Sequence, residues 1–397
     1  MTENSQEKAP IWRFQPLADF EPPSPPAKAT LRKKLGIFIK QLLPGKNKND
    51  EPDDLKSPPD ELLDRAAPTP PREPFFRAVD EEVDRWLARE DPANQVLVFV
   101  LATGDELSSL GEWACTRDAE SIPAPNPASI LAGAMETLPT FEGDGLLVIP
   151  QLELWLRRHH VSLGLIRELI GRLHRSKRPC VVGMNSWTWS YLNRAAEISV
   201  ELPPPLTLAP FDAAALSVWL SDLAEKSLVF RRDDDGEVVL DPAEDGSVAR
   251  GSENGNGNGG SDFMEILAAA SRGHPWLAWH LFRQSMQVRP KNGAASRDHD
   301  PGRTVWVSST FSRELPEMEK RERASALLVF HALLIHGELT LADLETVLPP
   351  IHTLHVVHKL ATRKILVSNE GKWSVESVFY PAVREALVHD GYPVDQL

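Results

Sequence analysis

The sequence predicts an α/β fold, with a parallel sheet that carries helices on both faces. Apolar runs at 96–102, at 145–149 (GLLVI) and around 180–184 (CVVGM) are typical of buried strands. Helical patterns lie between them, at 126–138 and 162–176. Strands that alternate with helices form parallel sheets with both faces covered.

Each helix of this domain, assigned to residues 76–230, has its own signal. The pattern AVDEEVDRWLARE opens the domain, and Asn126 followed by Pro127 is a typical helix start. Another helix is predicted at DAAALSVWLSDL. The helix over 162–176 places four apolar residues on one face, at helical spacing. They are Leu163, Ile166, Ile170 and Leu173.

Three further segments follow the α/β domain. Residues 231–262 run from RRDDDGE to GSENGNGNGG, and this acidic, glycine-rich composition predicts a flexible linker. Residues 263–290 predict a helical lid segment of two helices, broken at Gly273 and Pro275. Residues 291–321 predict a polar linker.

The C-terminal part, residues 322–397, has a different element order. Helical patterns at 323–335, 341–348 and 352–363 precede ILVSNEGKWSV, which predicts two strands joined by a glycine turn. Three helices followed by a hairpin make a winged-helix domain. One more amphipathic helix is expected in FYPAVREALVHDGY.

Composition limits the function classes. The chain has 397 residues, and 43 basic against 57 acidic residues give a net charge of -14, so no overall field attracts nucleic acid or an anionic membrane. Two cysteines, outside any CxxC pair, favour a reducing cytoplasm over a disulfide framework. No run approaches the roughly 18 apolar residues of a spanning helix.

The N-terminal 75 residues are proline-rich and predict a disordered tail that contains one amphipathic helix near 28–46. A basic helix of this kind docks on a protein partner or lies peripherally on the inner face of a membrane. The alternative is a helix that folds back on its own protein. Its apolar stripe is Leu31, Leu35, Phe38 and Leu42, and its cations include Arg32, Lys33 and Lys34.

From residue 95 onward this order of elements resembles the AAA+ and STAND branches of the P-loop ATPases. In that family the first strand runs into GxxxxGK[ST], whose backbone N–H groups and lysine hold phosphates. Here the strand runs into ATGDELSSLGEW, where Gly104 and Gly111 are present but no lysine follows. Asp105 and Glu106 would repel phosphate. The resemblance is therefore to a degenerate member without the phosphate-binding loop.

Three other positions match the family in part. After GLLVI the family places an acid that holds Mg²⁺, whereas this chain has Pro150 and Gln151, and its first carboxylate is Glu153. Asn185 resembles the sensor residue of the next strand, with helix capping as the alternative. RGHPW, with Gly273 and Pro275, is similar to the STAND GxP segment near adenine, and a plain inter-helix turn is the alternative.

Metal and DNA chemistry have weaker support. His352, His355 and His358 are spaced by three on a helix, which spreads the first and last by about 120° and prevents convergence on one ion, so no metal site is expected. Lys359, Arg363 and Lys364 of the third winged-helix helix are candidates for DNA phosphates. The acidic balance argues against nucleic acid as a partner.

Three hypotheses follow. The first is a non-hydrolysing, ATPase-derived regulatory or scaffold protein of bacterial type, which needs no cofactor and works through protein partners. The second is a divergent ATPase that binds ATP and Mg²⁺ with Glu153 and Asn185. The third is a winged-helix DNA-binding regulator. Sequence leaves the question of enzymatic activity undecided, with the balance against it.

Overall fold

The computed structural model describes residues 10–26, 56–89, 95–117, 119–242, 259–288, 303–308 and 313–397. These residues divide into two compact units. Unit 1 comprises the described parts of 1–20, 72–209 and 314–397, and unit 2 those of 21–71 and 210–313. The proposed amphipathic helix near 28–46 lies outside the described residues.

Unit 1 contains a six-stranded sheet of order β1-β6-β2-β5-β4-β3. Only the pairing of β1 with β6 is antiparallel. Val96 of β2 pairs with Cys180 of β5, and both strands are buried along their whole length, as their unbroken apolar runs predicted. The strands are β1 (Phe14–Pro16), β2 (Val96–Leu101), β3 (Glu120–Ser121), β4 (Leu147–Ile149), β5 (Cys180–Asn185) and β6 (Leu206–Leu208).

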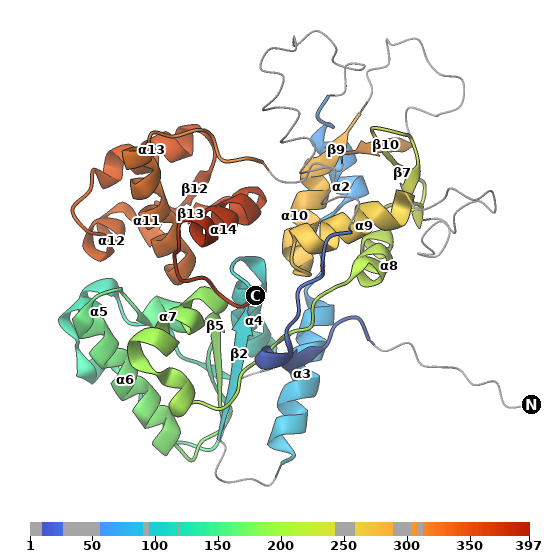
Figure 1. Ribbon diagram of the computed structural model, residues 1–397. Helices are drawn as coiled ribbons and strands as arrows, with labels where there is room; N and C mark the ends of the chain where they lie inside the picture. The colour runs from blue at the N-terminus through green and yellow to red at the C-terminus, as the bar shows by residue number, and fades with distance from the viewer. Residues whose placement is uncertain are drawn as a thin grey trace, which may run out of the picture. The chain divides into compact units, whose positions relative to one another are not determined.

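Helices cover both faces of this sheet, which confirms the predicted fold class (Figure 1). Gly183 in the middle of β5 allows one helix to pack closely. A Cβ there would lie 2.3 Å from Leu110 Cδ2 and 2.4 Å from Pro150 O. Asn126 caps its helix as expected, accepting from Ser129 N at 2.9 Å. The helices are α3 (Glu73–Leu87), α4 (Asp105–Thr116), α5 (Pro127–Ala132), α6 (His160–Arg175) and α7 (Ser186–Ala196).

Residues 314–397 of unit 1 form what we call the C-terminal module. Its elements follow the predicted order of three helices, a hairpin and a last helix, and Gly337 (φ 75°) ends the first helix. Glu370 and Gly371, both with positive φ, make the hairpin turn. The elements are α11 (Lys320–His336), β11 (Leu339–Thr340), α12 (Leu341–Val347), α13 (Thr353–Thr362), β12 (Leu366–Asn369), β13 (Lys372–Val375) and α14 (Tyr380–His389).

Unit 2 contains a four-stranded sheet of order β8-β7-β10-β9. The two helices predicted on either side of Gly273 are present. Arg283 joins helix α2 to α10 through an ion pair with Asp64 at 2.7 Å. The elements are α2 (Asp60–Ala66), α8 (Ala213–Leu223), β7 (Val229–Arg232), β8 (Val238–Leu240), α9 (Gly259–Ala270), α10 (Pro275–Ser285), β9 (Met286–Gln287) and β10 (Thr304–Val307).

The expected tail over 1–75 needs correction where the structure describes it. Trp12, Phe14, Leu17 and Phe20 are buried, and Phe14 packs against Phe99 of β2 with ring centroids 4.7 Å apart. Residues 60–66 are helical. Four large apolar side chains supply the burial that the average composition of the segment conceals.

The linkers expected at 231–262 and 291–321 also contain strands, β8 and β10. The acidic run RRDDDGE is a hairpin turn that surrounds Arg232, a side chain only 8% exposed. Arg232 pairs with Asp234 at 2.7 Å and donates to Asp235 at 3.0 Å. Charge compensation of one buried guanidinium accounts for the acidic residues that resembled a linker.

Among the described residues, none of the helices is both long and apolar enough to cross a bilayer.

Candidate functional site at the carboxyl edge of the sheet

Parallel strands of doubly wound sheets bind ligands beyond their carboxyl ends, at the point where the strand order reverses. In this sheet that point lies at β2, since the chain continues from β2 to the β3 side and later returns to β6 on the other side. We call the ends of β2, β4 and β5 the carboxyl edge. It carries Gly104, Glu153 and Asn185.

The turn after β2 is too short for a phosphate-binding loop. β2 ends at Leu101 and α4 begins at Asp105, with Gly104 (φ 111°) as the cap residue. Gly111 lies inside α4, where a Cβ would lie 3.7 Å from Pro150 Cβ. The eight-residue GxxxxGK[ST] motif places both glycines in one loop. The two glycines here therefore do not form such a loop, and Gly111 is a packing residue.

Glu153 follows β4 in the turn Leu152–Trp155 and is only 1% exposed. Its Oε2 accepts from the backbone N–H of Asn185 at 3.3 Å, and its Oε1 has no partner among the described residues. Burial raises the pKa of this carboxyl to about 8, against the lowering effect of its backbone hydrogen bonds. At neutral pH the group is mostly protonated, whereas Mg²⁺ takes carboxylate oxygens. Glu153 does not fit a magnesium ligand.

Asn185 ends β5, is fully buried and caps α7, the alternative that its position had left open. Its Oδ1 accepts from Thr188 N at 2.7 Å, and its Nδ2 donates to Ile335 O at 3.1 Å. The Thr188 hydroxyl donates to the same carbonyl. Ile335 lies in the last turn of α11, where carbonyls lack intrahelical donors. Asn185 therefore connects the sheet to the C-terminal module.

A buried ion pair lies beside this contact. Arg157 Nε lies 3.2 Å from Asp343 Oδ1, with side chains 8% and 11% exposed. Arg157 Nη1 also donates to Leu156 O at 2.8 Å, and Asp343 accepts from the Thr340 hydroxyl at 2.8 Å. Buried ions of this kind need such additional hydrogen bonds.

Two buried histidines of α11 complete the contact. Burial and the neighbouring Arg158 lower the pKa of His331 to about 4, and burial lowers that of His336 to about 3. His331 Nδ1 lies 3.4 Å from Arg158 Nη1, and its Nε2 lies 3.2 Å from Pro393 O. A neutral ring that donates from Nε2 and accepts at Nδ1 satisfies both neighbours.

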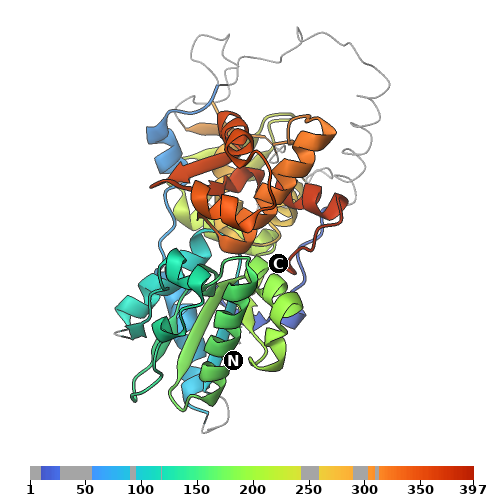
Figure 2. The same cartoon turned by 90° about the vertical axis from the view of Figure 1, so that its left-hand side faces the viewer.

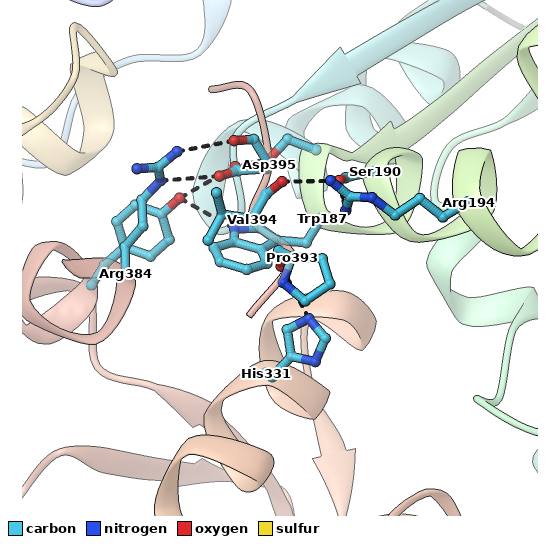
Figure 3. Close-up of polar contacts among 10 residues, drawn as sticks. Trp187, Ser190, Arg194, His331, Arg384, Pro393, Val394 and Asp395 are labelled. Carbon is cyan, nitrogen blue, oxygen red and sulfur yellow. Dashed lines mark hydrogen bonds and ion pairs between the residues drawn. The ribbon is translucent and has the colours of Figure 1, made fainter. Parts of the chain in front are cut away.

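We call residues 393–397 the strap, and Pro393, Val394 and Asp395 of this segment lie beside α7 (Figure 3). In both overall views the end of the chain is beside this helix (Figure 2). The Asp395 carboxylate accepts from Ser186 Oγ at 2.6 Å and from Arg384 Nε at 3.0 Å, and Val394 O accepts from Ser190 Oγ at 3.0 Å. The strap thus places a carboxylate at the first residue of α7, directly beyond β5.

The sequence did not reveal Arg157, Arg158, Asp343, His331 or the strap as edge residues. Arg157 and Asp343 are 186 residues apart in the chain, and Asn185 meets a backbone carbonyl that no side chain marks. The sequence offered two signals: the two arginines in LRRHH, which follow the strand β4, and the two histidines in the apolar helix α11.

The other proposed nucleotide residues, Gly273 and Pro275, belong to unit 2. Gly273 (φ 79°) accepts from Phe211 N at 2.9 Å, and a Cβ there would approach Pro210 Cα to 2.9 Å. Pro275 is the first residue of α10. Gly273 and Pro275 therefore form the turn between α9 and α10, and Gly273 lets this turn lie close to the backbone of residues 210–211.

Two of the three proposed DNA cations, Lys359 and Arg363, already have an acidic neighbour. Lys359 Nζ lies 2.6 Å from Glu322 Oε2, and Arg363 lies 3.9 Å from the same carboxylate. Lys364 is exposed with φ 57°, and Lys372 in the hairpin pairs with Glu338 at 2.5 Å. A cation with an adjacent carboxylate attracts phosphate less strongly.

The residues present do not fit Mg²⁺ with a nucleotide. The turn after β2 is short and has no lysine, the only acid after β4 is buried and protonated, and Asn185 is engaged in packing. Within the part of the chain that the structure describes, no three His, Cys, Asp or Glu residues are grouped as a metal site.

No protein-family model matches the sequence, and no curated protein matches it.

Several solved structures resemble the fold distantly. Cdc6p from Pyrobaculum aerophilum is 13% identical with a TM-score of 0.29, covering 84% of this chain and 98% of that one. A RuvB mutant of Thermotoga maritima is 16% identical with a TM-score of 0.32, covering 84% and 99%. The Aeropyrum pernix ORC1 protein in complex with DNA is 16% identical with a TM-score of 0.31, covering 82% and 94%. Scores this low do not assign the chain to a family.

Proposed function

We propose that this chain is a regulatory or scaffold protein that acts through protein partners, on an AAA+/STAND-like framework that neither binds nor hydrolyses ATP. One observation carries the proposal. The groups at the carboxyl edge, where such a sheet would hold its ligand, are engaged in internal contacts: Asn185 donates to Ile335 O, and Glu153 is buried with a pKa that burial raises. The proposed role for the C-terminal module, as a winged helix, is packing and partner contact.

The alternative of an active ATPase requires Glu153 and Asn185, and both residues are engaged in internal contacts at this edge. Glu153 would have to lose a proton, leave its buried position and face solvent before it could bind Mg²⁺. Asn185 would have to give up the cap of α7 and the bond to α11. The first change breaks the bond from Asn185 N–H to Glu153, and the second breaks the bond that joins the sheet to the C-terminal module.

The DNA-binding alternative is disfavoured by the paired cations of α13 and the hairpin. In the C-terminal module acidic residues also outnumber basic ones. A weak association with duplex DNA that falls steeply with salt would revive this alternative. The proposed membrane or partner contact of residues 28–46 is a separate element of the proposal, and liposome co-sedimentation of the full chain against a 28–46 deletion tests it.

A nucleotide titration of the full chain tests the proposed function. A fluorescent ATP analogue is titrated with and without Mg²⁺, and unlabelled ATP is used as competitor. We expect no saturable, competable binding up to millimolar nucleotide. Magnesium-dependent binding in the micromolar range, weakened by Asn185→Ala, would overturn the proposal. Asn126→Ala, which removes a similar cap from another helix, α5, is the matched control.

A further inference from the structure

The strap fills a pocket with the chemistry of an anion site. The pocket is lined by the Ser186 hydroxyl at the start of α7, the Arg384 guanidinium and the Tyr380 hydroxyl, and it holds the Asp395 carboxylate (Figure 3). A helix N-terminus, a hydroxyl and a guanidinium together favour a negative charge. The Asp395 side chain is fully buried there.

The strap binds as an extended peptide. Asp395 and Leu397 are buried while Gln396 between them is exposed, an alternation typical of an extended segment with one face against the protein. The main chain contributes as well, since Arg384 Nη2 donates to Asp395 O at 2.9 Å and Ser190 Oγ donates to Val394 O. The recognised pattern is an acidic residue followed two positions later by leucine.

We propose that this pocket is a docking site for an extended acidic segment of a partner protein, and that the strap occupies it in the resting chain. The proposal rests on the proposed function, because it specifies the chemistry of the protein partner. The charge of the pocket and the segment already seated in it argue for this occupant. A partner segment with Asp-x-Leu reproduces the contacts of Asp395 and Leu397 and displaces the strap.

The strap is covalently joined to the chain, and this connection determines how tightly a partner must bind to displace it. A segment joined to its site by a short linker has an effective concentration on the order of millimolar, so a free peptide of equal affinity binds weakly to the intact chain. A substitution that empties the pocket raises the fraction of competent sites and tightens the apparent affinity in proportion. Weakening the strap should therefore expose the site.

Peptide binding to the full chain tests this. The probe is fluorescein-labelled YPVDQL with a blocked C-terminus, titrated by anisotropy into the wild type and into Asp395→Ala. We expect saturable binding to both, about tenfold or more tighter for Asp395→Ala. The control peptide YPVNQL, without the acid, should bind neither. Asp390→Ala, whose carboxylate pairs with Arg323 instead, should behave as the wild type.

Absence of saturable binding to a folded Asp395→Ala chain, or equal binding of YPVNQL, would overturn the proposal. If circular dichroism shows that Asp395→Ala is unfolded, the wild-type titration decides, and no binding up to about 10 mM peptide, well above the effective concentration of the strap, overturns it. The nucleotide titration is independent. A chain that binds neither peptide nor ATP refutes the docking site alone, whereas ATP binding refutes the proposed function.

Discussion

The carboxyl edge and the exposed face of α13 with the hairpin differ in how their polar groups are neutralised. At the edge, Arg157, Asp343 and Asn185 are buried and bonded to elements distant in sequence. On α13 and the hairpin, Lys359 and Lys372 pair with glutamates at the surface. Buried pairs are costly to break and surface pairs contribute little, so the same type of substitution should have unequal effects in the two regions.

The largest effect is expected for Arg157→Met. It leaves Asp343 buried without its cation, which costs about 3–5 kcal/mol in the free energy of unfolding of unit 1. Urea unfolding of the full chain measures it. Arg172→Met is the control, because Arg172 pairs with Glu168 on the exposed side of α6, and it should change the value by less than about 0.5 kcal/mol. If Arg157→Met and Arg172→Met lowered the free energy of unfolding equally, the difference between buried and surface ion pairs would be contradicted.

Asn185→Ala should rank second, at about 2–3 kcal/mol, because it removes the cap of α7 and the bond to Ile335 O together. Asn126→Ala removes only a cap and should cost about 1 kcal/mol. The same urea experiment compares them. If both cost the same, the bond to α11 contributes nothing measurable.

Sequence reasoning found the parts of the edge but not its contacts. Apolar runs located β2, β4 and β5, and cap residues such as Asn126 located helix starts, because both signals are local. The bond from Asn185 to Ile335 O spans 150 residues and depends on how the C-terminal module packs against the sheet within unit 1. Burial of Glu153, and with it the raised pKa, is likewise a property of the packed structure.

The second sheet shows the same limit. β7 to β10 are two to four residues long and come from three stretches separated by undescribed residues, so no periodic pattern marks them. Phe14 and Trp12 were missed because prolines dominate the composition around them. Their burial could be recognised only once Phe14 was seen against Phe99.

Glu153→Gln should change the pH dependence of stability. The pKa of Glu153 is raised by folding, so its contribution is complete below pH 4.5 and is lost as pH rises toward about 8. Between pH 5 and 7 the free energy of unfolding of the wild type should fall by about 2 kcal/mol relative to that of the Gln variant. Over these two pH units, this fall stays below the limit of about 1.4 kcal/mol for each unit. Thermal unfolding at several pH values measures it.

Glu168→Gln is the control for that series. The neighbouring Arg172 lowers the pKa of Glu168, so this carboxylate is already ionised in both states above pH 5 and adds no slope there. A wild type whose stability runs parallel to Glu153→Gln across pH 5–7 would show that Glu153 is ionised and accessible.

The smallest effects are expected on the exposed face. Lys359→Met and Lys372→Met each break a surface ion pair and should change stability by less than about 0.5 kcal/mol. Neither should alter duplex DNA retardation by the full chain, because we expect no salt-sensitive complex to begin with. A complex weakened by both substitutions would make this face a DNA contact.

Thermal unfolding with and without 1 mM MgATP tests the central claim, that the carboxyl edge binds the C-terminal module instead of a nucleotide. A ligand present at 100 times its Kd stabilises the folded state by about 2.7 kcal/mol, which is a shift of several degrees. We predict the same Tm in MgATP as in Mg²⁺ alone. A rise of several degrees that Asn185→Ala abolishes would show that the edge still holds nucleotide.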